Sequence, residues 1–141
     1  MMAGPGGAPR RIMIVEDERI VALDVRAMVR RLGHEVCAMT GSGEEALRLL
    51  PGAGPDLILM DIMLEGELDG VETTRRIRSN RRIPVIFASA YSDERTRLRA
   101  YETEPSAFLV KPLDLRSLKK AIDSALAADP WNPPLDEPDA S

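Results

Sequence analysis

The chain has 141 residues, 44% hydrophobic and 30% charged, which is the balance of a single folded globular domain. Its single cysteine excludes an internal disulfide and is typical of a reducing compartment, and no apolar run approaches the roughly 20 residues that cross a bilayer. The net charge of −4 disfavours general binding to nucleic acid or anionic membranes, so the sequence predicts a cytoplasmic domain with neither partner.

The two ends of the chain differ in composition from its middle. Residues 1–9 hold three glycines and two prolines and predict a flexible leader. Residues 129–141 hold four prolines and four acidic residues, which favours a disordered, solvated tail. Docking of Trp131 on the domain is the alternative for this tail. The expected folded domain therefore spans residues 10–128.

Five short apolar runs predict the strands of a sheet. They are residues 12–15, 36–39, 57–60, 85–88 and 107–110. Each run is continuous rather than alternating, which is the pattern of strands buried on both faces of a parallel sheet.

Amphipathic stretches between these runs predict helices. The first and last are the clearest, because their apolar residues recur every three or four positions along one helix face. Those residues are Val21, Val25, Met28 and Leu32 in the first stretch, and Leu115, Leu118, Ile122 and Leu126 in the last. The stretch from 93 to 104 is the weakest, with Leu98, Tyr101 and Ala100 as its candidate inward residues.

Capping residues indicate where the helices begin and end. The expected starts lie at Ser42 with Glu45, at Asp69 with Glu72, and after Asp114. The expected ends lie at Gly33 and at the Pro51–Gly52 pair. Five strand–helix repeats predict an α/β fold with a doubly wound parallel sheet and helices on both faces.

Polar residues follow four of the five apolar runs, at the sheet edge where open parallel sheets bind ligands. They are Glu16 and Asp17 after the first run, Asp61 after the third, Ser89 after the fourth and Lys111 after the fifth. Gathered carboxylates repel one another, and a hard cation such as Mg²⁺ relieves that repulsion. A carboxylate can also accept a phosphoryl group whose oxygens a lysine and a serine hold. The set suits phosphoryl transfer onto a carboxylate.

Four motifs occur in chain order, each at the end of an expected strand. They are Ile14-Val15-Glu16-Asp17-Glu18, Leu59-Met60-Asp61-Ile62 with Asp69-Gly70 downstream, Phe87-Ala88-Ser89-Ala90-Tyr91, and Leu109-Val110-Lys111-Pro112. Together they resemble the receiver domain of two-component response regulators, over residues 10–128. The resemblance implies a flavodoxin-like fold with a five-stranded parallel sheet of order 2-1-3-4-5 and five helices.

The resemblance also implies an acceptor and a metal site. Asp61 is the implied phospho-acceptor, which takes a phosphoryl group from a sensor histidine kinase or a phosphotransfer protein. Glu16, Asp17, Asp61 and the backbone carbonyl of Met63 are the implied ligands of Mg²⁺ or Mn²⁺. The domain is expected to catalyse only its own phosphorylation and dephosphorylation, so it is not an enzyme in the usual sense.

Three further residues have roles implied by the resemblance. Lys111 pairs with the phosphoryl group, and its bond to Pro112 is cis in the family. Ser89 moves toward the phosphoryl oxygens, and the aromatic ring of Phe108 swings inward as the domain switches. Such a domain is a two-state element biased by a local change of charge.

The chain departs from the family pattern in the loop after Asp61. Glu65 stands where many receivers have a proline, and the loop has what looks like one extra residue. The positions that tune hydrolysis of the acyl phosphate in the family, two after Asp61 and two after Ser89, are Met63 and Tyr91. Neither side chain positions water well, and the resulting hypothesis is a long-lived phospho-form.

Other functions compete with phosphoryl transfer. One is a receiver-fold adaptor that binds proteins without being phosphorylated. The complete set of acceptor, metal-binding, hydroxyl and lysine residues argues against this alternative. Another is dinucleotide binding, because Gly41-Ser-Gly-Glu-Glu-Ala46 matches G-x-G-x-x-A after a strand. The Ser42/Glu45 capping box explains that motif, and its two acidic residues would repel a pyrophosphate. A haloacid-dehalogenase-type phosphatase is excluded, since Met63 stands where it needs an aspartate.

The expected output is a relay of the phosphoryl group or a phosphorylation-sensitive protein surface. The chain after Lys111 has room for one helix and the tail, so no output domain is expected. Besides the kinase, a downstream protein is an expected partner, and so is a second copy through residues 93–128. Arginines between 75 and 99 predict a solvated, ion-paired face, with a docking surface for an acidic partner as the alternative.

Overall fold

The computed structural model describes residues 8–90 and 93–127. The strands are β1 (Arg11–Val15), β2 (Glu35–Thr40), β3 (Leu57–Asp61), β4 (Val85–Ser89) and β5 (Ala107–Val110). The helices are α1 (Arg19–Arg31), α2 (Gly43–Ala53), α3 (Gly70–Arg78), α4 (Glu94–Glu102) and α5 (Leu115–Ala127). The expected tail and Tyr91 lie outside the described residues.

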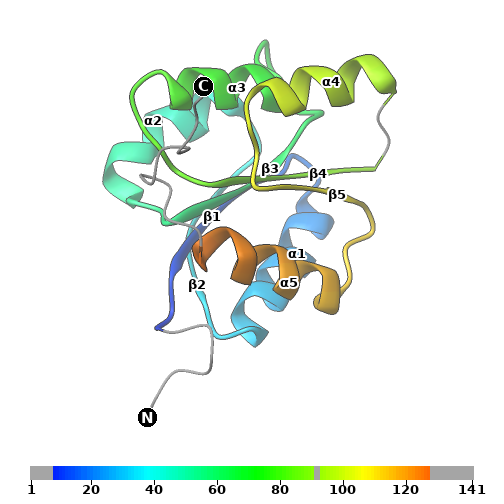
Figure 1. The fold of residues 1–141 in the computed structure, drawn as a ribbon. Coiled ribbons are helices and arrows are strands. Elements are labelled where there is room, and N and C mark those ends of the chain that lie inside the picture. Colours follow the sequence, from blue (N-terminus) through cyan, green and yellow to red (C-terminus); the bar gives the residue numbers. More distant parts are fainter. Residues whose placement is uncertain (1–7, 91–92, 128–141) are drawn as a thin grey trace, which may run out of the picture.

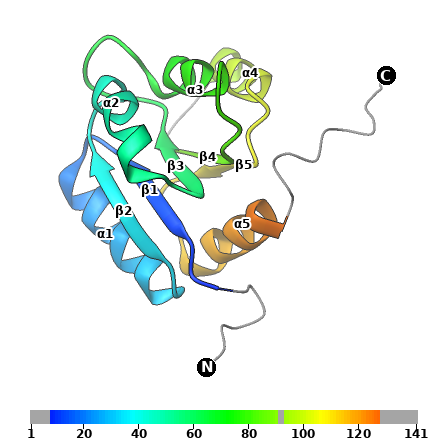
Figure 2. The ribbon, with the colours of Figure 1, turned by 90° about the vertical axis from the view of Figure 1, so that its left-hand side faces the viewer.

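The strands form one parallel sheet in the order β2-β1-β3-β4-β5, as expected (Figure 1). Helices α1 and α5 cover one face, and α2, α3 and α4 cover the other (Figure 2). Because side chains of a strand alternate between faces, each face has its own apolar core, one around Phe87 and one around Ile86. Within the described ranges, no helix combines the length and apolarity needed to span a membrane.

Burial differs between the central and the edge strands. Every residue of β3 and β4 is buried, as the continuous apolar runs predicted. For β2 and β5 the prediction of full burial is wrong, since both are largely half-buried. They are the two edges of the sheet, where one side of the strand has no neighbouring strand.

The predicted helix starts are confirmed by side-chain hydrogen bonds. Ser42, Asp69 and Asp114 each accept from the backbone N–H three residues later, at 3.1, 2.8 and 2.7 Å. The predicted stop at Pro51–Gly52 is wrong, because α2 continues through both residues to Ala53. Pro51 removes one N–H donor from the helix, but later residues still donate. Gly54, at φ 56°, ends the helix by donating its N–H to the carbonyl oxygen of Leu50.

Helix α4 packs differently from the expectation. Ala100 is fully buried, but Leu98 and Tyr101 are 58% and 49% exposed, so their assignment as inward residues is wrong. The small side chain of Ala100 lets the helix lie close to the sheet, and Tyr101 instead stacks beside Phe108 of β5, with ring centroids 5.9 Å apart. The consequence is an exposed apolar margin along α4.

Gly70, the first residue of α3, lies directly against the end of β3. Its N–H donates to the carbonyl oxygen of Ile62 at 2.7 Å. A Cβ at Gly70 would overlap the carbonyl oxygen of Asp61, so only glycine allows this approach. The start of α3 thereby fixes the backbone on which the Asp61 side chain stands.

We expect Gly70→Ala to destabilise the protein by roughly 1–3 kcal/mol, because the methyl group must displace the backbone of Asp61. Gly52→Ala is the matched control, since its Cβ meets no atom within 4 Å. This control should be neutral or stabilising by about 0.5–1 kcal/mol, because alanine favours the helix. Urea unfolding of the three proteins measures both effects, and equal stabilities would contradict the close approach.

Candidate functional site

Side chains from four strands meet at one edge of the sheet. Glu16 and Asp17 follow β1, Asp61 ends β3, Ser89 ends β4 and Lys111 follows β5. The strands are parallel, so their carboxyl ends share this edge, and residues distant in sequence become neighbours. The structure therefore brings together the polar set that the sequence singled out.

Lys111 binds two of the carboxylates at once. Its Nζ lies 2.5 Å from Oε1 of Glu16 and 3.1 Å from Oδ2 of Asp61. All three side chains are nearly buried, at 12%, 5% and 6% exposure. The backbone N–H of Lys111 donates to Ser89 at 2.9 Å, and the Lys111–Pro112 bond is cis, as the resemblance implied. One ammonium group thus joins the ends of β1, β3 and β5.

The three carboxylates form a compact oxygen cluster. Carboxylate oxygens of Glu16, Asp17 and Asp61 all lie within 4.8 Å of one another. Asp61 and Glu16 are buried, whereas Asp17 is half-buried at the rim. Several carboxylates around a partly open position are a donor set that suits Mg²⁺, which keeps some of its waters. The residues present fit a hard divalent cation.

The same cluster shifts proton affinities. Burial and the neighbouring charge of Glu16 raise the pKa of Asp61 to about 6, although Lys111 opposes the shift. Burial and Glu16 also raise the pKa of Asp17. For Lys111, burial acts to lower the pKa, but hydrogen bonds and attraction to Glu16 and Asp61 outweigh it and raise the pKa. The carboxylates repel each other, and the ammonium group relieves only part of that repulsion.

The two expected switch residues lie on neighbouring strands. Ser89 is buried at the end of β4. Phe108 of β5 is half-buried, and its ring packs between Phe87 and Tyr101 with centroids 6.3 and 5.9 Å away. The guanidinium of Arg97 lies over it, 4.8 Å from the ring centroid. Sequence reasoning missed Arg97, because its contact with β5 depends on how α4 is placed.

The loop between β3 and α3, residues 62–69, is held by a residue that the sequence analysis also missed. The carboxylate of Glu44, in the first turn of α2, accepts backbone N–H groups of Glu67 and Leu68 at 3.0 and 3.2 Å. Gly66 turns the loop beside it at φ 88°. The loop after Asp61 that departs from the family pattern is therefore held by α2.

Asp69 links this loop to α4. One of its oxygens caps α3, and the other accepts from the guanidinium of Arg99 at 3.2 Å. Asp69 precedes Gly70, which contacts the backbone of Asp61. Sequence spacing predicted the cap but not the ion pair, which joins residues 30 positions apart.

The glycine motif at residues 41–46 has a structural explanation. Ser42 caps α2 through Glu45, as expected. A Cβ at Gly43 would overlap the hydroxyl oxygen of Thr73, so this glycine permits close packing of α2 on α3. Nothing in this arrangement favours a dinucleotide site.

The family model described as "Response regulator receiver domain" matches residues 12–123. The chain belongs to this family. Receiver domains are in general signalling modules rather than enzymes. They bind Mg²⁺ through acidic residues, and the cluster of carboxylates described above agrees with this property. The expected family and the flavodoxin-like fold are thus confirmed.

Several relatives of this receiver domain belong to longer regulators. The transcriptional regulatory protein PdtaR of Mycobacterium tuberculosis is 34% identical over 131 residues, which cover 89% of this chain and 63% of PdtaR. AfsQ1 of Streptomyces coelicolor is 35% identical over 115 residues, 82% of this chain and 50% of AfsQ1. The chain therefore spans less than two thirds of these relatives.

Solved structures show the same fold. The signal receiver domain of a modulated diguanylate cyclase from Desulfovibrio desulfuricans superposes with a TM-score of 0.80 at 38% identity, covering 84% of this chain and 94% of that one. A response regulator from Aurantimonas superposes with a TM-score of 0.77 at 33% identity, covering 85% and 86%.

We expect Asp61→Asn to stabilise the metal-free protein at neutral pH by roughly 1–3 kcal/mol, since one pKa unit corresponds to about 1.4 kcal/mol. The folded-state pKa of about 6 lies above the ordinary 3.8, so the wild type loses stability relative to the variant as the pH rises through this range. Urea unfolding in EDTA at about pH 4 and about pH 7.5 measures the difference.

Asp24→Asn is the control for this prediction, because Asp24 is exposed on α1, away from the cluster. Its effect on the free energy of unfolding should be small at both pH values. If the difference in unfolding free energy between wild type and Asp61→Asn shrinks as the pH rises, the surroundings of Asp61 do not disfavour its charged form.

Proposed function

We propose that this receiver domain accepts a phosphoryl group on Asp61 in a Mg²⁺-dependent reaction. The observation that supports this most is the pairing of Asp61 with Lys111 inside a cluster of three carboxylates. Asp61 supplies a nucleophile, and Lys111 supplies a fixed positive charge beside it. The proposed donor is a histidine kinase or a phosphotransfer protein in the cytoplasm.

The chemistry asks little of the protein beyond placement and charge. An oxygen of Asp61 attacks the phosphorus, the bond from phosphorus to the donor breaks with its electron pair leaving on the donor, and an acyl phosphate forms. Lys111, 3.1 Å from Asp61 before the reaction, is placed to pair with a phosphoryl oxygen. The Ser89 hydroxyl is proposed to donate to another.

The metal is proposed to lie among Glu16, Asp17 and Asp61, with the backbone carbonyl of Met63 as a further ligand. When bound, Mg²⁺ neutralises charge on the carboxylates and the phosphoryl group. The three carboxylates lie at the ends of β1 and β3, two adjacent central strands, so their positions depend on the sheet.

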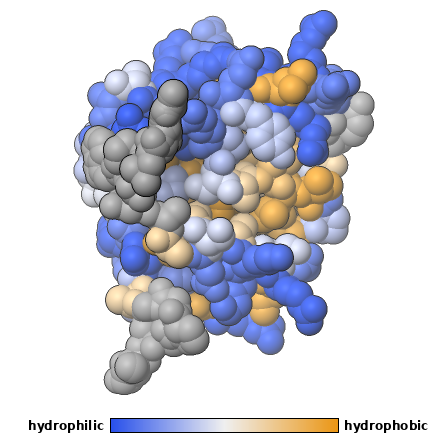
Figure 3. Space-filling model, viewed as in Figure 1, coloured by the Kyte–Doolittle hydropathy of each residue, from blue (hydrophilic) through white to orange (hydrophobic). Residues whose placement is uncertain are grey.

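The output is proposed to pass through α4, β5 and α5. Leu98, Tyr101 and Val110 are 58%, 49% and 59% exposed there, and Figure 3 shows apolar surface where β5 lies in Figure 1. Movement of Ser89 and Phe108 after phosphorylation would change this surface. A downstream protein or a second copy is the proposed partner, through residues 93–128, unless the phosphoryl group is relayed onward.

Intact-mass measurement tests the proposal. Incubation with Mg²⁺ and acetyl phosphate should add one phosphoryl group to the wild type and none to Asp61→Asn. EDTA should prevent the addition, because the acidic cluster then lacks its cation. If the wild type binds Mg²⁺ but takes up no phosphoryl group from any donor, the protein is instead a receiver-fold adaptor.

We expect the phospho-form to be long-lived. Met63 is 67% exposed beside Asp61 and offers no polar group to hold an attacking water, and the same argument from residue type applies to Tyr91. Met63→Asn and Tyr91→Glu should therefore each shorten its lifetime, measured as loss of the added mass after removal of donor. Leu23→Asn on α1 is an exposed control that should leave the lifetime unchanged. Equal lifetimes in all four proteins would contradict the hypothesis.

A further inference from the structure

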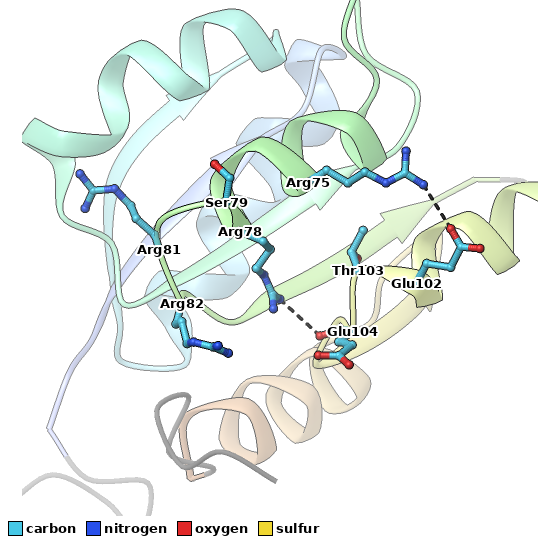
Figure 4. A pocket seen from close by; sticks show the side chains of 8 residues that line it. All are labelled: Arg75, Arg78, Ser79, Arg81, Arg82, Glu102, Thr103 and Glu104. Atoms are coloured by element: carbon cyan, nitrogen blue, oxygen red, sulfur yellow. Dashed lines mark hydrogen bonds and ion pairs between the residues drawn. The ribbon is translucent and has the colours of Figure 1, made fainter. Parts of the chain in front are cut away.

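A cleft of about 490 Å³ lies where β4 and β5 begin, at the edge of the sheet opposite the carboxylate cluster. Figure 4 shows the side chains that line it. We refer to it as the arginine cleft, because four of its lining residues are arginines and two are glutamates. They are Arg75, Arg78, Arg81, Arg82, Glu102 and Glu104. The cleft lies between the end of α3 and the turn from α4 into β5, and its lining carries more positive than negative charge.

The four arginines of this cleft outnumber its two glutamates. Arg75 pairs with Glu102 at 3.2 Å, and Arg78 donates to the backbone carbonyl of Glu104 at 3.3 Å. The Nε of Arg78 is buried without a hydrogen-bond partner among the described residues. Arg81 is exposed. The ends of two helices favour some positive charge here, but not an unsatisfied donor.

The last helix ends at the same edge of the sheet. Arg81 and Arg82 precede β4, and Glu104 precedes β5, so the cleft lies where these strands begin. Helix α5 starts beyond the opposite end of β5 and packs along β4 and β5. Its 13 residues rise about 1.5 Å each, roughly 20 Å, which is enough to traverse a five-residue strand. The chain that follows α5 therefore departs from the edge that holds the arginine cleft.

The residues that follow α5 have a composition complementary to the cleft. Residues 128–141 hold four carboxylates and no lysine or arginine, and these four equal the whole net charge of the chain, −4. The carboxylates are those of Asp129, Asp136, Glu137 and Asp139. The segment also contains Trp131, the one tryptophan of the chain, whose ring is the best partner for a guanidinium face. At up to about 3.3 Å per residue, the segment has ample reach.

We propose that residues 128–141 of this chain occupy the arginine cleft. Trp131 packs on an arginine face, and the acidic residues beyond it lie against the positively charged lining of the cleft. Tethering makes the contact intramolecular, so its effective concentration is in the millimolar range and weak ion pairs suffice. The proposal concerns the edge opposite Asp61 and does not depend on phosphorylation.

Trp131 itself reports the contact. Acrylamide quenching of its fluorescence in the full chain should be weaker, by about twofold or more, than in a synthetic peptide of residues 128–141. The charge reversal Arg81→Glu/Arg82→Glu should raise the quenching constant toward that of the peptide. Neutralising the other partner with Asp136→Asn/Glu137→Gln/Asp139→Asn should do the same without altering the folded domain. Added salt should act in the same direction, since the ion pairs are exposed.

Arg30→Glu/Arg31→Glu is the matched control. These arginines are exposed at the end of α1, which reaches the same edge of the sheet but lies outside the cleft. Quenching in this control should equal that of the wild type. Equal quenching in the wild type and the free peptide would overturn the proposal. Two other results would also overturn it. One is a control variant that loses the protection of Trp131 from quenching as fully as the cleft variant does. The other is protection of Trp131 that grows with protein concentration, which would place the segment on a second copy.

Discussion

The ion pairs of Lys111 with Glu16 and Asp61 are the interaction on which the arrangement of the site depends. They join the ends of three strands and are nearly excluded from water. Removing the ammonium would leave two buried carboxylates facing each other, which explains why a buried lysine is needed there at all. Burial, and after it the neighbouring charge of Glu16, still raises the pKa values of Asp61 and Asp17. Lys111 therefore holds the site together, but the three carboxylates still favour an additional positive charge.

Residues around Asp61 support this arrangement through backbone contacts. Gly70 lies against the carbonyl of Asp61, and Glu44 accepts the N–H groups of the loop between them. Asp69, at the end of this loop, caps α3 and pairs with Arg99, so it connects the loop to α4. Arg97, two residues before Arg99 on α4, lies over the ring of Phe108. A series of contacts thus connects the loop after Asp61 with the exposed margin of α4 and β5.

Departures from the sequence-based expectations have a common cause in packing. Pro51 and Gly52 are locally poor helix residues, yet α2 continues through them, because Leu50 is buried against the sheet and Gly54 provides the left-handed end. Leu98 and Tyr101 have apolar side chains, yet they face outward because α4 meets the sheet through Ala100. In each case the packing of the helix against the core outweighed a local preference of the sequence.

The sequence by itself determined the five strands, the capping residues and the identity of the polar set, because period, cap spacing and strand ends are local properties. It also determined the family, through four motifs at strand ends. Only the tertiary structure decided the distances within the site, the clamp by Glu44 and the link from Asp69 to Arg99. It alone showed that Arg78 and Arg81 line one cleft. These contacts join residues far apart in the chain, and a pattern along the sequence holds no information on which distant groups the fold makes neighbours.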